Sequence, residues 1–467
     1  MKERNLVYIT GITFVATLGG LLFGYDTAVI SGAEKSIQEY LVLSLGLNTW
    51  IHGITISSAL IGCIIGGISS GLMSSGIGRK KTLFVAALLF FLSALGSANP
   101  EFLFFTRGEP SIGVLLMFNF YRIIGGIGVG LASAVSPVYI GEIAPADIRG
   151  RLVSYNQFAI IFGMLVVYFV NWGIASGQPI EWVNTIGWRR MFASEAIPAG
   201  LFGMLLLLVP ESPRYLALKG YNEKAQGILG KINGKEKAIE IFREIRDTVE
   251  KSSGKLFSFG KLVIIIGILL SVFQQFVGIN VALYYAPRIF EGMGSAKDVS
   301  MMQTVVMGLV NVIFTVIAIM TVDKWGRKPL LMTGSIGMAI GMFAIGALAF
   351  FQVIGIATLV FIIIYTASFM MSWGPITWVL ISEIFPNKIR GRAVAVAVAA
   401  QWAANYLISS TYPAMMEISS GGTYWFYGVM SILSFIFVWK IVPETKNKTL
   451  EEMEHLWLKK IGKAAKN

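Results

Sequence analysis

Residues 142–151 read EIAPADIRGR, and residues 383–392 read EIFPNKIRGR. Two further pairs of segments match in the same order: GIGRKK from Gly76 with KWGRKP from Lys324, and Pro210-Glu211-Ser212 with Pro443-Glu444-Thr445. The three pairs are offset by roughly 230–250 residues. Three ordered matches at a common offset indicate an internal duplication, so we predict that the chain consists of two similar halves.

The composition indicates that much of the surface faces something other than water. The chain has 467 residues, of which 55% are hydrophobic and 14% charged, whereas a soluble domain carries about 25% charged residues. Continuously apolar runs predict spanning helices rather than alternating strands. We expect twelve spans, near 6–30, 50–73, 81–98, 115–138, 152–175, 190–210, 260–287, 301–321, 329–350, 354–380, 393–414 and 423–442.

The spans divide into two sets of six. The predicted domains are a six-helix bundle over 1–210, a linker over 211–259, a second bundle over 260–442 and a tail over 443–467. Equal orientation of the two bundles requires a pseudo-symmetry axis along the membrane normal, which is the major facilitator arrangement. Apolar residues at helical spacing over 236–250 favour amphipathic helices in the linker, with an unstructured linker as the alternative.

The net charge of +12 reflects membrane topology better than nucleic-acid binding. Lys and Arg gather in alternate loops, and this predicts that those loops and both termini are cytoplasmic. The single cysteine, Cys63, excludes an intrachain disulfide, and His52 and His455 lie too far apart in sequence to suggest a metal site. We therefore expect no metal and no cofactor, and we interpret the first apolar stretch as a retained span rather than a signal peptide.

Two acids and one base stand out well inside the predicted spans. Asp26 and Arg122 should lie at a similar depth in the outer half of the membrane, where each alone would be costly. As neighbours they could neutralise each other, either as a static ion pair or as a carboxylate whose proton affinity changes with conformation. Glu195, in the sixth span, could assist proton release or hold helix ends together, and the sequence leaves both open.

Uncharged amides are unusually frequent in the spans: Gln157, Gln274, Gln275, Asn280, Asn311 and Gln401. An amide donates and accepts hydrogen bonds, as a sugar hydroxyl does. Buried amides can also hold helices together. Gly278 could unwind the seventh span and let adjacent Gln274 and Gln275 reach one cavity, and Gly374 with Pro375 could let the tenth span bend.

Charges of both signs recur at the predicted cytoplasmic ends of both halves. They are Arg79, Glu142, Arg149, Glu211, Arg327, Glu383, Arg390 and Glu444. Solvated loop charges are the alternative for any one of them. Because the pattern is duplicated, we interpret them as a cytoplasmic gate whose pairs close this side and break when it opens.

The chain resembles the sugar porter family of the major facilitator superfamily, and within it most closely the bacterial D-xylose–proton symporters, with glucose facilitators as more distant relatives. The resemblance covers nearly the whole chain. It is carried by GGLLFGYDTAVISG (19–32), RIIGGIGVGLAS (122–133), PESPR (210–214), QQFVGIN (274–280), SWGPITWVLISEIFP (372–386) and PETKNKTLEE (443–452).

The resemblance implies a proton-coupling role for Asp26, where facilitators carry a neutral residue. It implies sugar contacts from Gln157, Gln274, Gln275, Asn280, Trp378 and Gln401, with Trp402 and Tyr284 nearby. Two positions depart from the family pattern. Ser75 and Gly76 replace an acidic and a basic residue in the first-half loop, which predicts a weaker latch there, and Met164 replaces a glutamine of the symporters.

We therefore expect an all-α membrane protein of the major facilitator fold, with twelve transmembrane helices in two pseudo-symmetric six-helix bundles and cytoplasmic linker helices. The expected function is import of a monosaccharide, D-xylose first, together with a proton, by alternating access. The alternatives are an uncoupled sugar facilitator and a sugar-sensing receptor, and an enzyme is not expected. The expected partners are the sugar, the proton and the lipid of a bacterial inner membrane, with the protein a monomer.

Overall fold

The computed structural model describes residues 5–145, 148–249, 256–292, 296–352, 356–386, 389–446, 452–453 and 456–459. Within this part of the chain, twelve helical segments are long and apolar enough to cross a membrane. The predicted all-α fold is confirmed. Most of the predicted tail, and residues 250–255 of the predicted linker, lie outside the described residues.

The first half contains six spans. They are built from α1 (Leu6–Ile37), α2 (Thr49–Gly76), α3 (Arg79–Ala98), α4 (Ile112–Ile143), α5 (Arg149–Ala175) and a last span composed of α6 (Ile180–Trp182), α7 (Trp188–Ser194) and α8 (Ala196–Leu208). The side chains of Asn48 and Ser111 cap α2 and α4 by accepting backbone N–H bonds of Ile51 and Val114. The first span is longer than predicted, because a π-helical turn continues α1 to Val42.

The second half repeats this plan. Its spans are built from α12 (Lys261–Phe276), α13 (Ile279–Tyr284), α14 (Ala286–Gly292), α15 (Lys297–Trp325), α16 (Arg327–Phe350), α17 (Ile356–Met371), α18 (Trp373–Ile384), α19 (Arg390–Ile418) and α20 (Ser420–Lys440). The seventh span breaks at Gly278, whose φ of +90° favours glycine. The tenth span breaks at Ser372, just before the predicted bend at Gly374 and Pro375.

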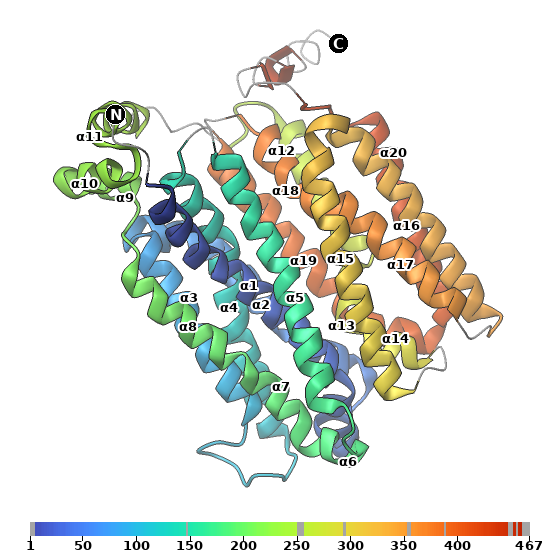
Figure 1. Cartoon of the computed structure of the whole chain (residues 1–467). Helices are drawn as coiled ribbons and strands as arrows, with labels where there is room; N and C mark the ends of the chain where they lie inside the picture. The colour runs from blue at the N-terminus through green and yellow to red at the C-terminus, as the bar shows by residue number, and fades with distance from the viewer. Residues whose placement is uncertain are drawn as a thin grey trace.

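The segment between the halves forms three short helices. They are α9 (Pro213–Leu218), α10 (Asn222–Asn233) and α11 (Lys235–Val249), which share a small apolar core. Figure 1 shows them beside the end of the helical bundle from which both termini emerge. We call this end the terminal face, and the opposite end, where α6 and α14 lie, the distal face.

The two halves pack against each other along two seams. Helix α2 packs against α19, and α5 packs against α15 (Figure 1). On the distal side, α1 also touches α13 and α14 of the second half. The segment that follows the break at Gly278 therefore faces the first span of the first half.

Helices within the first half approach closely at glycines. A Cβ added to Gly24 on α1 would be placed 1.9 Å from the backbone oxygen of Ile160 on α5. The contact is reciprocal, since a Cβ at Gly163 on α5 would be placed 2.2 Å from the backbone oxygen of Leu21. Such small-residue crossings are a common way to pack helices in membranes. This crossing fixes the depth of Asp26, two residues beyond Gly24.

Candidate functional site

A buried ion pair lies at the centre of the first half. Arg122 on α4 donates from Nη1 to Asp26 Oδ1 on α1 at 2.7 Å and from Nη2 to the Asp26 backbone oxygen at 3.2 Å. Both side chains are almost fully buried, at 1% and 0% exposure. The guanidinium also lies over the Phe192 ring, 5.3 Å from its centroid. Removing Arg122 would leave a buried carboxylate without its cation.

Glu195 adds a second acid to this pair. It lies between α7 and α8, is fully buried, and interacts electrostatically with Asp26 and Arg122. Its carboxyl group lies within hydrogen-bonding reach of the Asp26 carboxyl, and neither of its oxygens has another partner among the described residues. The three groups carry two acids and one base, so they are electrically neutral together when they hold one proton. A buried, unpaired carboxylate is costly, which favours holding that proton.

Four of the predicted amides of the second half form one hydrogen-bonded chain. Asn280 donates to Gln275 Oε1 at 2.5 Å, Gln275 donates to Gln274 Oε1 at 3.3 Å, and Gln401 donates to the same oxygen at 2.5 Å. Gln274 in turn donates to the backbone oxygens of Trp373 and Gly374, where α18 begins. The helix break at Gly278 thus brings α12, α13, α18 and α19 to one polar row.

Aromatic residues connect this row to the first half. Trp402 on α19 lies beside Phe23 on α1, with ring centroids 5.5 Å apart, and it borders Gly67 on α2. Its indole Nε1 is buried and has no partner in the described part of the chain. Tyr284 accepts a hydrogen bond from Asn405 at 3.3 Å.

The structure also places two further predicted sugar contacts, Gln157 and Trp378, and two residues that were not among those contacts, Met164 and Asn311. Gln157 on α5 and Trp378 on α18 are half-buried, while Met164 on α5 is buried. Asn311 is buried on α15. The structure leaves the roles of all these residues as predictions.

The charged groups at the terminal face form the same clamp in each half. In the first-half clamp, Arg79 makes a two-pronged ion pair with Glu142, at 2.9 and 2.8 Å, and the backbone N–H groups of Arg79 and Lys80 donate to Glu211. In the second-half clamp, Arg327 pairs with Glu383 at 3.1 and 2.8 Å. The backbone N–H groups of Arg327 and Lys328 donate to Glu444.

In this conformation each ion pair joins helix ends of one half. Closure of the terminal face by these charges therefore stays a prediction. The first-half clamp has the same contacts as the second despite Ser75 and Gly76, so the departure in that loop does not remove its pairing. Arg149 is exposed at the start of α5, and Arg390 is half-buried at the start of α19.

Sequence reasoning missed a polar cluster on the distal face. Glu34, His52 and Arg288 meet there, from α1, α2 and α14. Glu34 could have been noticed, because it lies eight residues after Asp26 on the same apolar helix, where acids are rare. Nothing in local spacing links it to Arg288.

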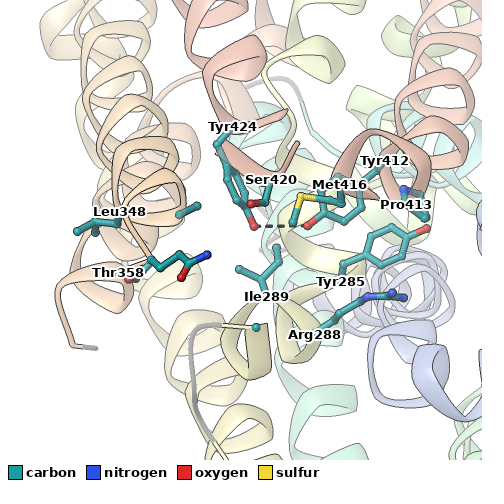
Figure 2. A pocket seen from close by; sticks show the side chains of 13 residues that line it. Tyr285, Arg288, Ile289, Leu348, Thr358, Tyr412, Pro413, Met416, Ser420 and Tyr424 are labelled. Atoms are coloured by element: carbon teal, nitrogen blue, oxygen red, sulfur yellow. Dashed lines mark hydrogen bonds between the residues drawn. The ribbon is translucent and has the colours of Figure 1, made fainter. Parts of the chain in front are cut away.

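A cavity of about 380 Å³ lies on the second-half side of this cluster. Figure 2 shows Arg288, Tyr285, Tyr412 and Tyr424 along its wall. The cavity therefore lies apart from the amide chain around Gln274.

The two duplicated halves, the broken helices between them and the buried polar row define a membrane transporter of the major facilitator fold. The chain belongs to the family described as "Sugar (and other) transporter", whose model matches residues 12–457. It is 55% identical to the D-xylose-proton symporter of Escherichia coli K12, covering 97% of each chain. It is 38% identical to the glucose facilitated diffusion protein of Zymomonas mobilis, covering 98% of this chain and 99% of that protein.

A solved structure agrees with the fold. The inward open conformation of the xylose transporter XylE from E. coli has a TM-score of 0.88 with this chain at 54% identity, covering 96% of this chain and all of that one. In the present structure the halves are in contact on the distal face, where α1 touches α13 and α14.

Proposed function

We propose that this protein is a proton-coupled symporter that imports a monosaccharide, with D-xylose as the first candidate, by alternating access. The buried cluster of Asp26, Arg122 and Glu195 carries the proposal. Its charges balance only when one proton is held, so a conformation that exposes the cluster to one side can exchange that proton with that side. The high identity to a D-xylose-proton symporter supports both the sugar and the coupling.

The proposed sugar site lies between the halves, at the amide chain. Gln274, Gln275, Asn280 and Gln401 supply hydrogen-bond groups from the second half, and Gln157 supplies one from the first. Trp378, Trp402 and Tyr284 supply apolar faces for sugar C–H groups. The two bundles, over 1–210 and 260–442, would tilt about this site while the linker over 211–259 connects them.

We further propose that the terminal face is cytoplasmic and that the protein is a monomer in a bacterial inner membrane. Lys and Arg concentrate in the loops of the terminal face, which supports this orientation. In each half, the clamp would then keep the cytoplasmic helix ends together while the halves move as units.

The test is uptake of labelled D-xylose into proteoliposomes with and without a proton gradient. The wild type should accumulate the sugar above equilibrium. Asp26→Asn leaves Arg122 and Glu195 balanced without a proton, so it should lose accumulation and retain exchange of labelled for unlabelled sugar. Full accumulation by Asp26→Asn would refute the coupling assignment.

An uncoupled facilitator is the second candidate, because a relative at 38% identity is a facilitated diffusion protein. The two differ in proton movement. Adding sugar to cells that contain a symporter makes the external medium more alkaline, whereas a facilitator causes no such change.

A further inference from the structure

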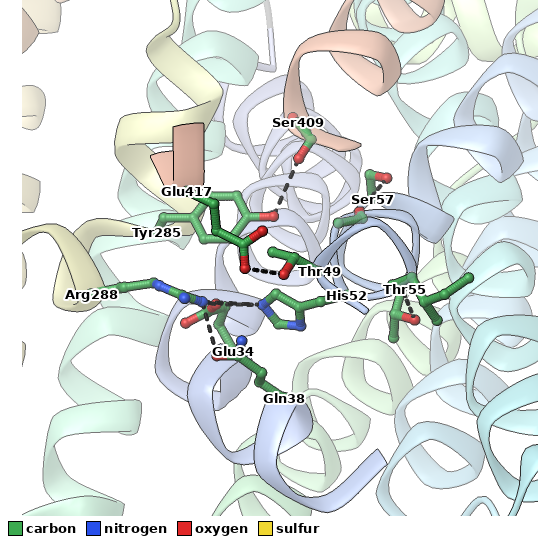
Figure 3. A network of polar contacts seen from close by, with 12 residues as sticks. Glu34, Gln38, Thr49, His52, Thr55, Ser57, Tyr285, Arg288, Ser409 and Glu417 are labelled. Carbon is green, nitrogen blue, oxygen red and sulfur yellow. Dashed lines mark hydrogen bonds and ion pairs between the residues drawn. The ribbon is translucent and has the colours of Figure 1, made fainter. Parts of the chain in front are cut away.

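The distal cluster joins the two halves through one buried carboxylate. Glu34 Oε1 on α1 accepts from Arg288 Nη1 of the second half at 2.5 Å and from His52 Nε2 of its own half at 2.5 Å (Figure 3). Arg288 also donates to Gln38 Oε1 at 3.0 Å, and its Nη1 lies 3.4 Å from His52 Nε2, which cannot accept from Arg288 while it donates to Glu34. The guanidinium therefore bonds twice to α1 and its extension, across the seam between the halves.

The two partners of this ion pair differ in their access to water. The Glu34 side chain is 2% exposed, whereas the Arg288 side chain is 38% exposed. Arg288 also borders the cavity shown in Figure 2, beside Tyr285. If the halves separate here, Arg288 can be hydrated at the cavity wall. Glu34 stays within the first half, where an unpaired carboxylate is costly.

We propose that Glu34 and Arg288 form a latch that holds the distal face closed, and that His52 is the partner that keeps Glu34 hydrogen-bonded once the latch opens. This inference rests on the proposed function, because alternating access requires the distal face to open. His52 suits the role because it lies on α2 of the same half as Glu34 and is fully buried. It stays beside Glu34 whichever way the second half tilts.

Arg288 and His52 then act in opposite directions on the same equilibrium. The bonds from Arg288 exist only in the closed state, so they favour closure. The bond from His52 exists in both states. In the open state, once Arg288 has moved away, His52 is the residue of this cluster that still bonds Glu34. Losing Arg288 should therefore open the distal face, and losing His52 should keep it closed.

A second ion pair between the halves provides a matched control. Lys35 Nζ and Glu291 Oε2 are 2.7 Å apart on the same face, but the two side chains are 53% and 19% exposed. Exposed pairs of this kind contribute little, because water and salt screen them. Lys35→Gln should leave the equilibrium unchanged, although it also removes a cation that bridges the halves.

The experiment measures the distance between spin labels on the distal face by electron–electron double resonance, without sugar and without a proton gradient. Labels are attached to Leu43→Cys and Ile418→Cys, which are 50% and 84% exposed, with Cys63 replaced by Ala. Arg288→Met should raise the ratio of long to short distances about tenfold, as expected for loss of a charge-assisted bond. Arg288→Lys should restore most of the short distances.

His52→Leu should lower the same ratio below that of the unsubstituted labelled protein. The latch is overturned if Arg288→Met and Lys35→Gln shift the ratio equally, or if Arg288→Met leaves it unchanged. The role of His52 is overturned if His52→Leu raises the ratio. Because these distances are measured without transport, a failure here leaves the Asp26→Asn test of the proposed function unaffected.

Discussion

The crossing of α1 and α5 offers a direct test of how the buried charge cluster is held in place. In Gly24→Ala, the added Cβ would be placed 1.9 Å from the backbone oxygen of Ile160, whereas ordinary van der Waals contact begins at 3.4 Å. The obstacle is backbone, which cannot rotate away, so the helices must separate by about 1.5 Å. Overpacking of this kind typically costs about 1–3 kcal/mol. Because Asp26 follows two residues later, its bond to Arg122 should lengthen as well.

The assay is thermal unfolding of the purified protein in detergent, followed by D-xylose uptake in proteoliposomes. Gly11→Ala is the matched control: it lies on the same helix, and its added Cβ meets nothing within 4 Å. Alanine also favours a helix over glycine by roughly 0.5–1 kcal/mol, so the control should be as stable as the wild type or slightly more so. Equal stability and uptake in the two variants would refute the argument that this crossing sets the position of Asp26.

Two further predictions concern the sugar site and the second-half clamp. Gln157→Ala and Gln275→Ala should each weaken D-xylose binding by more than about tenfold through loss of a hydrogen-bond partner, measured by calorimetric titration, and unchanged affinity would remove the residue from the site. Burial raises the pKa of Glu444, but hydrogen bonds from four backbone N–H groups together lower it by more. The net shift of the pKa is therefore downward from 4.5. Its stabilising effect is therefore full above that value and is lost as the pH falls through the lowered pKa. Glu444→Gln should reduce the melting temperature at neutral pH and match the wild type in acid, whereas a pH-independent difference would contradict this.

The sequence predicted most of the architecture because hydrophobic length and duplication are local or repetitive signals. The twelve spans and the helix break at Gly278 follow from run length and from a residue that tolerates positive φ. The depth of Asp26 and Arg122 also follows, because helical rise converts position in sequence into position in the membrane. The ends of the spans were less predictable. The last span of the first half begins at Ile180, ten residues before the prediction, because Glu181, Arg189 and Arg190 make residues 180–190 resemble a loop.

Contacts across the seam could not be predicted in the same way. Glu34 and Arg288 are more than 250 residues apart, and only the packing of α1 against α14 brings them together. The pairing in the clamps was not predictable either. Their charges were identified from the repeat, but a repeat cannot tell whether a pair forms within one copy or between two copies. In this conformation the pairs form within each half.

Donors and acceptors in the amide chain are arranged in a fixed order. The contact at one end, with the backbone oxygens of Trp373 and Gly374, sets that order. The backbone oxygens of Trp373 and Gly374 can only accept, so the Gln274 nitrogen must face them and its oxygen must face Gln275 and Gln401. Both neighbours must then present nitrogen to Gln274. The side-chain oxygen of Gln401 remains without a partner among the described residues. A sugar that reaches this oxygen must donate a hydroxyl hydrogen to it. A sugar in which that hydroxyl is replaced by a methyl ether cannot donate, so it would lose this hydrogen bond.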